Sequence, residues 1–118
     1  MQKELRVRVQ RKMDLETRRL QLARAERQPL DGWLRRARKA LGVNATEIAR
    51  RLEVDPSMVF YLERSECKET ISLKRLGQMA EAMDCKLVYG IVPREGTFED
   101  LALEQLEHRI LYGRRRDG

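Results

Sequence analysis

Two short helix-forming segments separated by a tight turn, in the stretch ATEIARRLEVDPSMVFYLE at residues 45–63, constrain the fold more than any other feature. Asn44 is placed to cap the first segment, and Glu47 three residues later completes a pattern similar to a capping box. Glu53 and Val54, between the segments, leave room only for a sharp turn. The spacing therefore predicts two helices that cross at a steep angle.

The second segment carries its own start signals. Asp55 can cap it, and Pro56 fits the first turn because that position needs no backbone N–H donor. Ala49 is small where the two helices would cross, so their backbones can approach closely. The apolar residues expected to face the core are Ile48, Ala49, Leu52, Val59 and Leu62.

Helical spacing and capping signals predict further helices on both sides. Residues 33–41 place apolar side chains four residues apart and end at Gly42, which supplies a left-handed stop. Ser72 can cap a fourth helix of this central region, and Thr97 opens a last one. A thin apolar stripe predicts another helix within residues 1–27, formed by Leu5, Val9, Met13, Leu20 and Ala23.

The stretch CKLVYGIV at residues 85–92, bounded by Asp84 and Pro93, is typical of a β-strand. A single strand leaves a row of unpaired backbone donors and acceptors. The same strand of a second copy, paired antiparallel across a two-fold axis, would satisfy them, which predicts a homodimer. The alternative is a monomer in which residues 5–9, which alternate with period two, complete a two-stranded ribbon. The residues expected at the dimer interface are Leu87, Tyr89, Ile91, Leu106 and Ile110.

Composition agrees with a small helical protein. The chain has 118 residues, of which 37% are charged and only 5% aromatic, and this suits a helical domain better than a sheet sandwich. We expect an all-α fold with three parts. These are a basic N-terminal helical arm (1–28), a central helix-turn-helix domain (29–84) and a C-terminal strand and helix for dimerisation (85–118).

Several classes of protein lack support in the sequence. No run of eighteen apolar residues could cross a membrane and no secretory apolar stretch begins the chain, so we expect a cytoplasmic protein. Cys67 and Cys85 have no metal-ligand spacing and are expected as reduced thiols, Cys85 within the core. The sole histidine, His108, has no serine near it in the sequence. We therefore expect no catalytic residue, no metal site, no cofactor and no enzyme activity.

The charge is unevenly distributed along the chain. Residues 1–42 carry thirteen Lys and Arg against five Asp and Glu, a net charge of +8, whereas residues 43–118 carry twelve against fourteen, a net charge of −2. A basic surface attracts phosphate and steers nucleic acid toward the protein. The N-terminal third is the expected source of most phosphate contacts, the alternative being an ordinary solvated helix surface.

The region 33–83 resembles the phage-repressor (Xre-like) helix-turn-helix family, because RRARKALGVNATEIARRLEVDPSMVFYLERSE keeps the register of that family without a gap. The resemblance implies a five-helix, lambda-repressor-like bundle that binds DNA through its third core helix, here residues 56–63. It implies a structural ion pair between Arg38 and Glu63, and it places Asn44 where a helix N-terminus meets phosphate.

Nearly the whole chain also resembles the family called mobile mystery protein A. The segments that carry this resemblance are RKMDLETRRL, LDGWLRRARKALGV and LERSECKETISLKRLGQMAEAMDCKLVYGIVP. Members of that family are bacterial regulators usually encoded beside a protein with a Fic domain, an AMP-transferring fold often used as a toxin. The resemblance implies an operon regulator with antitoxin-like character and a Fic-domain protein as a candidate partner.

The recognition helix departs from the wider Xre-like pattern. Pro56, Ser57, Phe60 and Tyr61 occupy the base-facing positions. Ser57 and Tyr61 can hydrogen-bond to bases or phosphates, whereas Phe60 can pack on thymine methyl groups or deoxyribose. The alternatives for the aromatic pair are packing within the chain and contact with a protein partner. Glu53 stands where relatives carry glycine, and a left-handed backbone there would cost about 1 kcal/mol.

Phosphate contacts are expected from one cap residue and from basic side chains that flank the recognition helix. They are Arg35, Arg36, Lys39, Asn44, Arg50, Arg51 and Arg64. The sequence favours a homodimeric, nucleoid-associated regulator that occupies an operator, expected to be its own promoter, and blocks polymerase. The alternative is an antitoxin that neutralises a neighbouring Fic-type toxin by direct contact.

Overall fold

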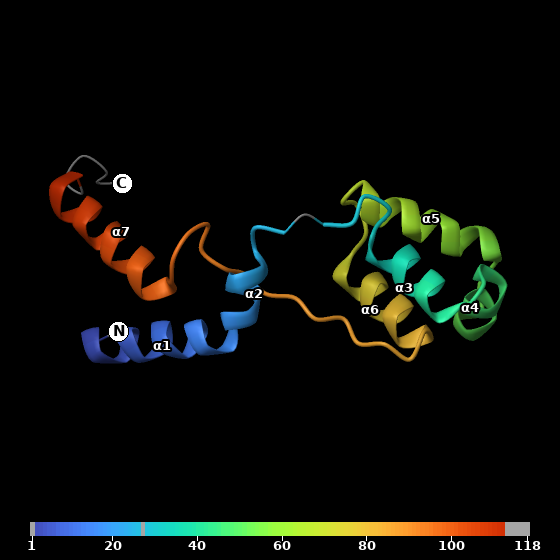
Figure 1. The fold of residues 1–118 in the computed structure, drawn as a ribbon, viewed down its shortest axis with the longest axis horizontal. Helices are drawn as coiled ribbons and strands as arrows, with labels where there is room; N and C mark the ends of the chain where they lie inside the picture. The colour runs from blue at the N-terminus through green and yellow to red at the C-terminus, as the bar shows by residue number, and fades with distance from the viewer. Residues whose placement is uncertain (1, 27, 113–118) are drawn as a thin grey trace. The chain divides into compact units, whose positions relative to one another are not determined.

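The computed structural model describes residues 2–26 and 28–112, which fall into two compact units. Unit 1 combines the two ends of the chain, Met1–Glu26 and Gly90–Gly118, and unit 2 is the continuous segment Arg27–Tyr89. Every regular element in the described residues is a helix, α1 to α7 in chain order (Figure 1). The two units have different kinds of interior, so each is described separately.

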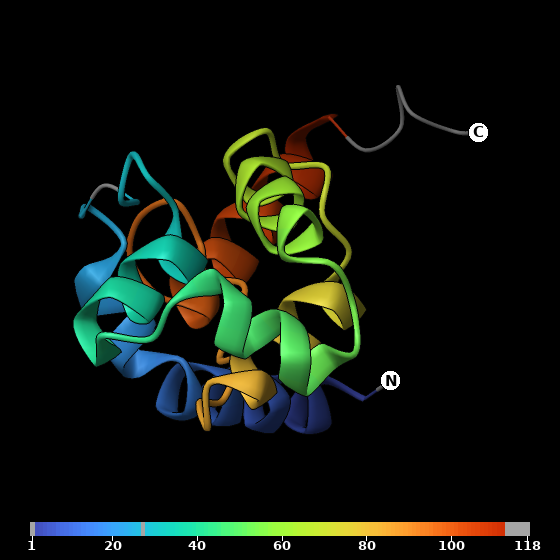
Figure 2. The same cartoon turned by 90° about the vertical axis from the view of Figure 1, so that its right-hand side faces the viewer.

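Unit 2 contains the four central helices expected from the capping and spacing signals (Figures 1 and 2). Their bounds are Trp33–Leu41 for α3, Ala45–Leu52 for α4, Pro56–Cys67 for α5 and Leu73–Ala82 for α6. All four helices contribute to one core. Its buried apolar residues are Leu34, Ala45, Ile48, Ala49, Val59, Leu62, Met79 and Met83.

Side-chain caps start three of these helices where the sequence predicted them. Asn44 Oδ1 accepts a hydrogen bond from the backbone N–H of Glu47 at 2.9 Å. Ser72 Oγ accepts one from the backbone N–H of Arg75 at 3.1 Å, and Asp55 caps α5 in the same way. Each cap satisfies a backbone donor that the first turn of a helix leaves without a partner, so local sequence defines these starts.

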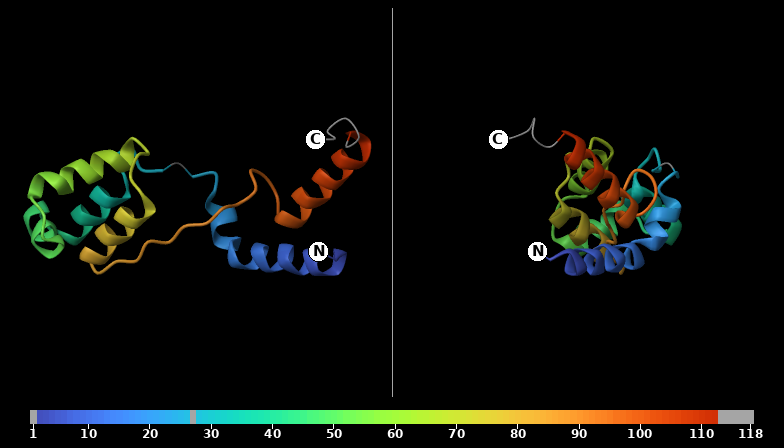
Figure 3. Two further views of the ribbon diagram at one scale, coloured as in Figure 1. Left: turned by 180° about the vertical axis from the view of Figure 1, so that it is seen from behind. Right: turned by 90° about the vertical axis from the view of Figure 1, so that its left-hand side faces the viewer.

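Unit 1 is built from helices at the two ends of the chain (Figures 1 and 3). The expected N-terminal helix is present as two segments, α1 (Lys3–Glu16) and α2 (Arg18–Ala23), separated at Thr17. Thr17 is buried, and its hydroxyl donates to the carbonyl oxygen of Met13 at 2.7 Å. The C-terminal helix, α7, spans Phe98–Tyr112.

Polar contacts hold the beginning of α7 against the other end of the chain. The carboxylate of Asp14 accepts hydrogen bonds from the first two backbone N–H groups of α7. The N–H of Phe98 donates to one oxygen at 2.7 Å, and the N–H of Glu99 donates to the other at 3.3 Å. The guanidinium of Arg24 donates to the carbonyl oxygens of Pro93 at 3.1 Å and Gly96 at 2.7 Å. These contacts join segments more than sixty residues apart in the sequence.

The predicted strand at residues 85–92 is wrong, because no strand occurs anywhere in the described part of the chain. Its apolar alternation favours extended backbone, but a strand also needs a partner row of hydrogen bonds. The weak candidate at residues 5–9 lies inside α1, where its apolar residues continue the helical spacing. The antiparallel route to a dimer through Leu87, Tyr89 and Ile91 therefore has no basis in this fold.

The environment expected for one cysteine also requires correction. Cys85 follows α6 at the surface instead of entering the core, and its thiol lies 3.4 Å from the carbonyl oxygen of Met83. Cys67, at the end of α5, is exposed as well, and both are free thiols.

Candidate nucleic-acid interface

The turn between α4 and α5 brings these two helices together at a sharp angle (Figure 2). Glu53 adopts a left-handed backbone with φ of 57°, and the next residue, Val54, donates its N–H to the carbonyl oxygen of Ala49 at 2.9 Å. Ala49 itself is almost completely buried, as its small side chain allows at a close crossing. The turn leaves one face of α5 on the core and the opposite face in solvent.

The buried face of α5 is anchored by an ion pair with α3. Arg38 Nε lies 2.7 Å from Glu63 Oε2, and Arg38 Nη2 lies 3.1 Å from Glu63 Oε1, which makes the contact bidentate. The side chains are only 13% and 6% exposed, respectively. The hydrogen bonds to Glu63 raise the pKa of Arg38 above its ordinary value, although burial acts in the opposite direction. The pair therefore fixes the angle at which α5 lies on α3.

Phe60 lies on the solvent side of this ion pair. Its ring centroid is 5.6 Å from the guanidinium carbon of Arg38, a cation–π distance, and the residue remains 44% exposed. One ring face thus meets the chain itself while the rest of the side chain stays accessible. Phe60 therefore packs within the chain, and its exposed part leaves a contact with DNA or a protein partner open as a prediction.

The other residues predicted to face bases also line the exposed side of α5. Tyr61 is 56% exposed, and Pro56 and Ser57 are exposed at the N-terminal end. Met58 is half-buried against the core, so it is less available than its neighbours for thymine contact. The exposed stripe continues toward the end of the helix through Arg64 and Lys68.

The hydroxyl of Ser57 is already engaged at the start of α5. It donates to Asp55 Oδ1 at 3.0 Å, and the backbone N–H of Ser57 donates to the same oxygen at 3.0 Å. These two hydrogen bonds, the backbone one first, lower the pKa of Asp55 below its ordinary value. With its proton used in the cap, Ser57 can present its oxygen as an acceptor to a base amino group.

The predicted phosphate ligands are all exposed on α3, α4 or α5 or at their caps. Five of them form no ion pair or side-chain hydrogen bond with any other described residue, and these are Arg35, Arg36, Lys39, Arg50 and Arg64. Arg35 and Arg64 line one hollow together with Phe60 and Lys68. Asn44 and Arg50 line a second hollow on α4. The structure thus brings two of these cations, Arg35 and Arg64, beside Phe60 on the exposed face of α5.

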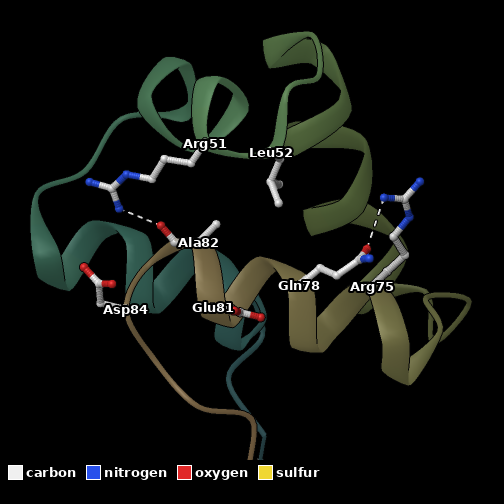
Figure 4. Close-up of a pocket in the computed structure, with 7 residues that line it drawn as sticks. All are labelled: Arg51, Leu52, Arg75, Gln78, Glu81, Ala82 and Asp84. Atoms are coloured by element: carbon white, nitrogen blue, oxygen red, sulfur yellow. Dashed lines mark hydrogen bonds between the residues drawn. The ribbon is translucent and has the colours of Figure 1, made fainter.

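Arg51 is placed differently from the other predicted phosphate ligands (Figure 4). Its guanidinium donates to the carbonyl oxygen of Ala82 at 2.6 Å, at the end of α6, and lies 4.0 Å from the carboxylate of Glu47. A cation at a helix C-terminus compensates the unsatisfied carbonyl groups there. Arg51 therefore joins α4 to α6 in this structure.

Two contributors were not anticipated from the sequence. Glu66 accepts hydrogen bonds from the backbone N–H groups of Trp33 at 2.8 Å and Leu34 at 2.9 Å, so a residue of α5 caps α3. Lys68 lies beside Arg64 in the hollow next to Phe60. The position of Lys68, four residues after Arg64, could have identified it from the sequence. No local pattern indicates that Glu66 caps α3.

The described residues contain neither a metal-ligand cluster nor a membrane-spanning helix. Among them, no group of three His, Cys, Asp or Glu side chains could hold a metal ion. None of their helices is both long enough and apolar enough to cross a membrane.

Residues 34–89 match a protein-family model whose description is helix-turn-helix. The matched stretch lies within unit 2 and includes α4, the turn and α5. No curated protein and no solved structure matches the chain. The family match supports a DNA-binding transcription regulator, and this family of regulatory domains is not typically enzymatic.

Proposed function

We propose that this chain, which carries a helix-turn-helix domain at residues 34–89, is a sequence-specific repressor that lays α5 in the major groove of an operator. The observation that carries the proposal is the division of α5 into two faces. Val59 and Leu62 are buried in the core, whereas Phe60, Tyr61 and Arg64 are exposed. A face of this kind, rigidly held by the Arg38–Glu63 ion pair, can meet base edges without rearrangement.

The side chains exposed on α5 favour apolar contact with bases over a dense set of hydrogen bonds to them. Phe60 offers an apolar edge to thymine methyl groups, and Tyr61 offers a hydroxyl to a base or a phosphate. Arg35 and Arg64 flank Phe60, so they are the first candidates for phosphate contacts on either side. Arg50 and Asn44 would form a second phosphate site at the start of α4.

In this proposal the regulator works by occupying DNA. A homodimer bound at its own promoter would exclude polymerase, and two copies of α5 would contact half-sites one duplex turn apart. The basic N-terminal segment would add salt-dependent affinity and keep the protein associated with the nucleoid.

The proposal is tested by titrating the protein into a labelled fragment of its native upstream region and into random DNA at several salt concentrations. We expect tighter binding to the native fragment, and a steep fall of affinity with salt on both fragments. Equal affinity for the two fragments at every salt concentration would contradict sequence-specific repression.

A second function is favoured by one specific observation, the two exposed aromatic residues on α5. Phe60 and Tyr61 have the character of interface anchors, and an antitoxin that contacts a Fic-domain toxin could use them. The resemblance to mobile mystery protein A supports this partner. Failure of specific DNA binding together with capture of the neighbouring gene product, lost in Tyr61→Ala, would favour the antitoxin.

A further inference from the structure

Unit 1 has well-formed helices but almost no interior. Thr17 and Pro93 are its only buried residues in the described part of the chain, and neither lies within a helix. Among the described residues, every buried Leu, Ile, Val, Ala and Met side chain belongs to unit 2. Isolated helices of this length are marginal in water, because most helical stability in proteins comes from packing an apolar face. Unit 1 therefore needs a further packing surface.

An apolar stripe lies exposed on each of its long helices. On α1, Leu5 and Val9 follow at a spacing of four residues, and each is about half exposed. On α7, Leu103, Leu106 and Ile110 share one face and are 58%, 44% and 74% exposed. Such stripes at helical spacing are the usual packing faces of helical bundles.

The two helices do not bury these stripes against each other. They meet at one end, where Asp14 caps α7 and Arg11 Nε lies 3.1 Å from Glu99 Oε1. From there α7 diverges from α1 (Figures 1 and 3). The stripes accordingly remain exposed instead of forming a closed contact.

The charges of the two helices indicate what covers these stripes. α1 carries five Lys and Arg against three Asp and Glu, and α7 carries four Asp and Glu against one Arg. Lys12 lies three residues beyond Val9, and Glu107 lies four residues beyond Leu103, so opposite charges flank the two stripes. One basic and one acidic helix make a surface complementary to itself under a two-fold rotation.

We infer that unit 1 is a dimerisation element in which the α7 stripe of each chain packs against the α1 stripe of a second copy, forming an intermolecular four-helix bundle. This deepens the proposed function by naming the surface that would place two recognition helices on one operator. Leu106 and Ile110, which the sequence predicted at a dimer interface, belong to this surface, and the surface needs no β-strand. Glu107 of one chain then faces the basic α1 of its partner, which adds electrostatic selectivity to the apolar contact.

The experiment is sedimentation velocity of the full chain over a range of concentrations. We expect a dimer of twice the 13.9 kDa chain mass that dissociates on dilution. Leu106→Glu and Ile110→Glu should each raise the dimer Kd by about 100-fold or more, because a charge enters the packed stripe. His108→Glu is the control, since this exposed residue lies on the opposite side of α7 from the stripe and should leave the Kd unchanged.

Two outcomes would overturn the inference: a wild-type chain that stays monomeric at every concentration, or a dimer that all three variants leave intact. Misfolding of unit 1 is detected by far-UV circular dichroism of each variant, and the fluorescence of the sole tryptophan, Trp33, shows that unit 2 stays folded. DNA titration of the same samples distinguishes the two proposals. A dimer without specific DNA binding contradicts the proposed sequence-specific repression and leaves this inference standing. A monomer that binds the native fragment specifically contradicts this inference and leaves sequence-specific DNA binding by α5 standing.

Discussion

At the scale of single residues, Glu53 shows how the turn between α4 and α5 is made. Its φ of 57° lies in the region where a side chain is disfavoured, and it is the residue that the sequence marked as unusual at a glycine position. The turn forms because the helices on both sides pack into one core and hold the backbone there. The backbone strain is therefore confined to Glu53, and a substitution at this position can remove it.

Glu53→Gly should stabilise unit 2 by about 1 kcal/mol, because glycine adopts a left-handed backbone without a steric penalty. Thermal unfolding followed by Trp33 fluorescence measures the change. Glu81→Gly is the control, since it places glycine in an exposed, ordinary turn of α6 and should destabilise by a similar amount. A lower melting temperature for Glu53→Gly would contradict the strain.

The Arg38–Glu63 pair makes a second prediction at this scale. Arg38→Ala leaves the carboxylate of Glu63 buried without its partner, so the free energy of unfolding should fall by about 3 kcal/mol or more. Arg36→Ala, on the same helix but exposed, should change it by less than about 0.5 kcal/mol. Urea denaturation compares the two variants, and an unchanged midpoint for Arg38→Ala would remove the proposed anchor of α5.

Tyr61 tests the recognition surface directly. Tyr61→Ala should weaken binding to the native upstream fragment by about tenfold, the loss of one good base contact, and should affect random DNA much less. Arg64→Ala, four residues away from Lys68, should weaken both by similar factors, as expected for a phosphate ligand. Fluorescence anisotropy on both fragments measures this, and equal losses for Tyr61→Ala would argue against a base contact.

At the scale of elements, the helices were predictable where a cap and an apolar face agree. Asn44, Asp55 and Ser72 cap α4, α5 and α6 as their positions in the sequence indicated. The strand predicted at residues 85–92 does not form. The preference for an extended backbone is local, whereas strand pairing depends on a distant partner. The caps that join elements were equally hidden: Glu66 serves α3 and Asp14 serves α7 across long sequence separations.

The Asp14 cap predicts how unit 1 responds to pH. Burial acts to raise the pKa of Asp14, but the hydrogen bonds from Phe98, Gln21 and Glu99 outweigh it and lower that pKa below its ordinary value. A lowered pKa means that the folded state favours the ionised form. The stabilisation is therefore present above the ordinary carboxylate pKa of about 3.9, and it is lost as the pH falls through the lower folded value.

Asp14→Asn should reduce the helix content of unit 1 at neutral pH, because the amide cannot replace a carboxylate at the positive end of α7. Far-UV circular dichroism between pH 2 and 7 measures the effect. The wild-type signal should fall at the acid end, and the difference between the two proteins should shrink there. A pH profile identical in both proteins would exclude a role for this carboxylate.

At the scale of the whole molecule, the two units differ in what stabilises them. Unit 2 has a continuous apolar core, whereas unit 1 is held by polar contacts and leaves its apolar stripes exposed. We therefore expect two unfolding transitions instead of one. Unit 1 should unfold first, as seen by circular dichroism, at a temperature that rises with protein concentration. Trp33 fluorescence should report a later, concentration-independent transition, and coincident transitions by both probes would contradict this division.

Local sequence was sufficient for the helical class, the caps, the turn and the division of α5 into buried and exposed faces, because each depends on residues within a few positions of one another. Register and spacing also placed Phe60 and Tyr61 on the exposed face of α5, and their contact with DNA stays a prediction. Only the tertiary structure decided that Phe60 makes a cation–π contact with Arg38, that Arg51 joins α4 to α6, and that the two ends of the chain form one unit. These outcomes depend on contacts between distant segments, whose free energy no local pattern encodes.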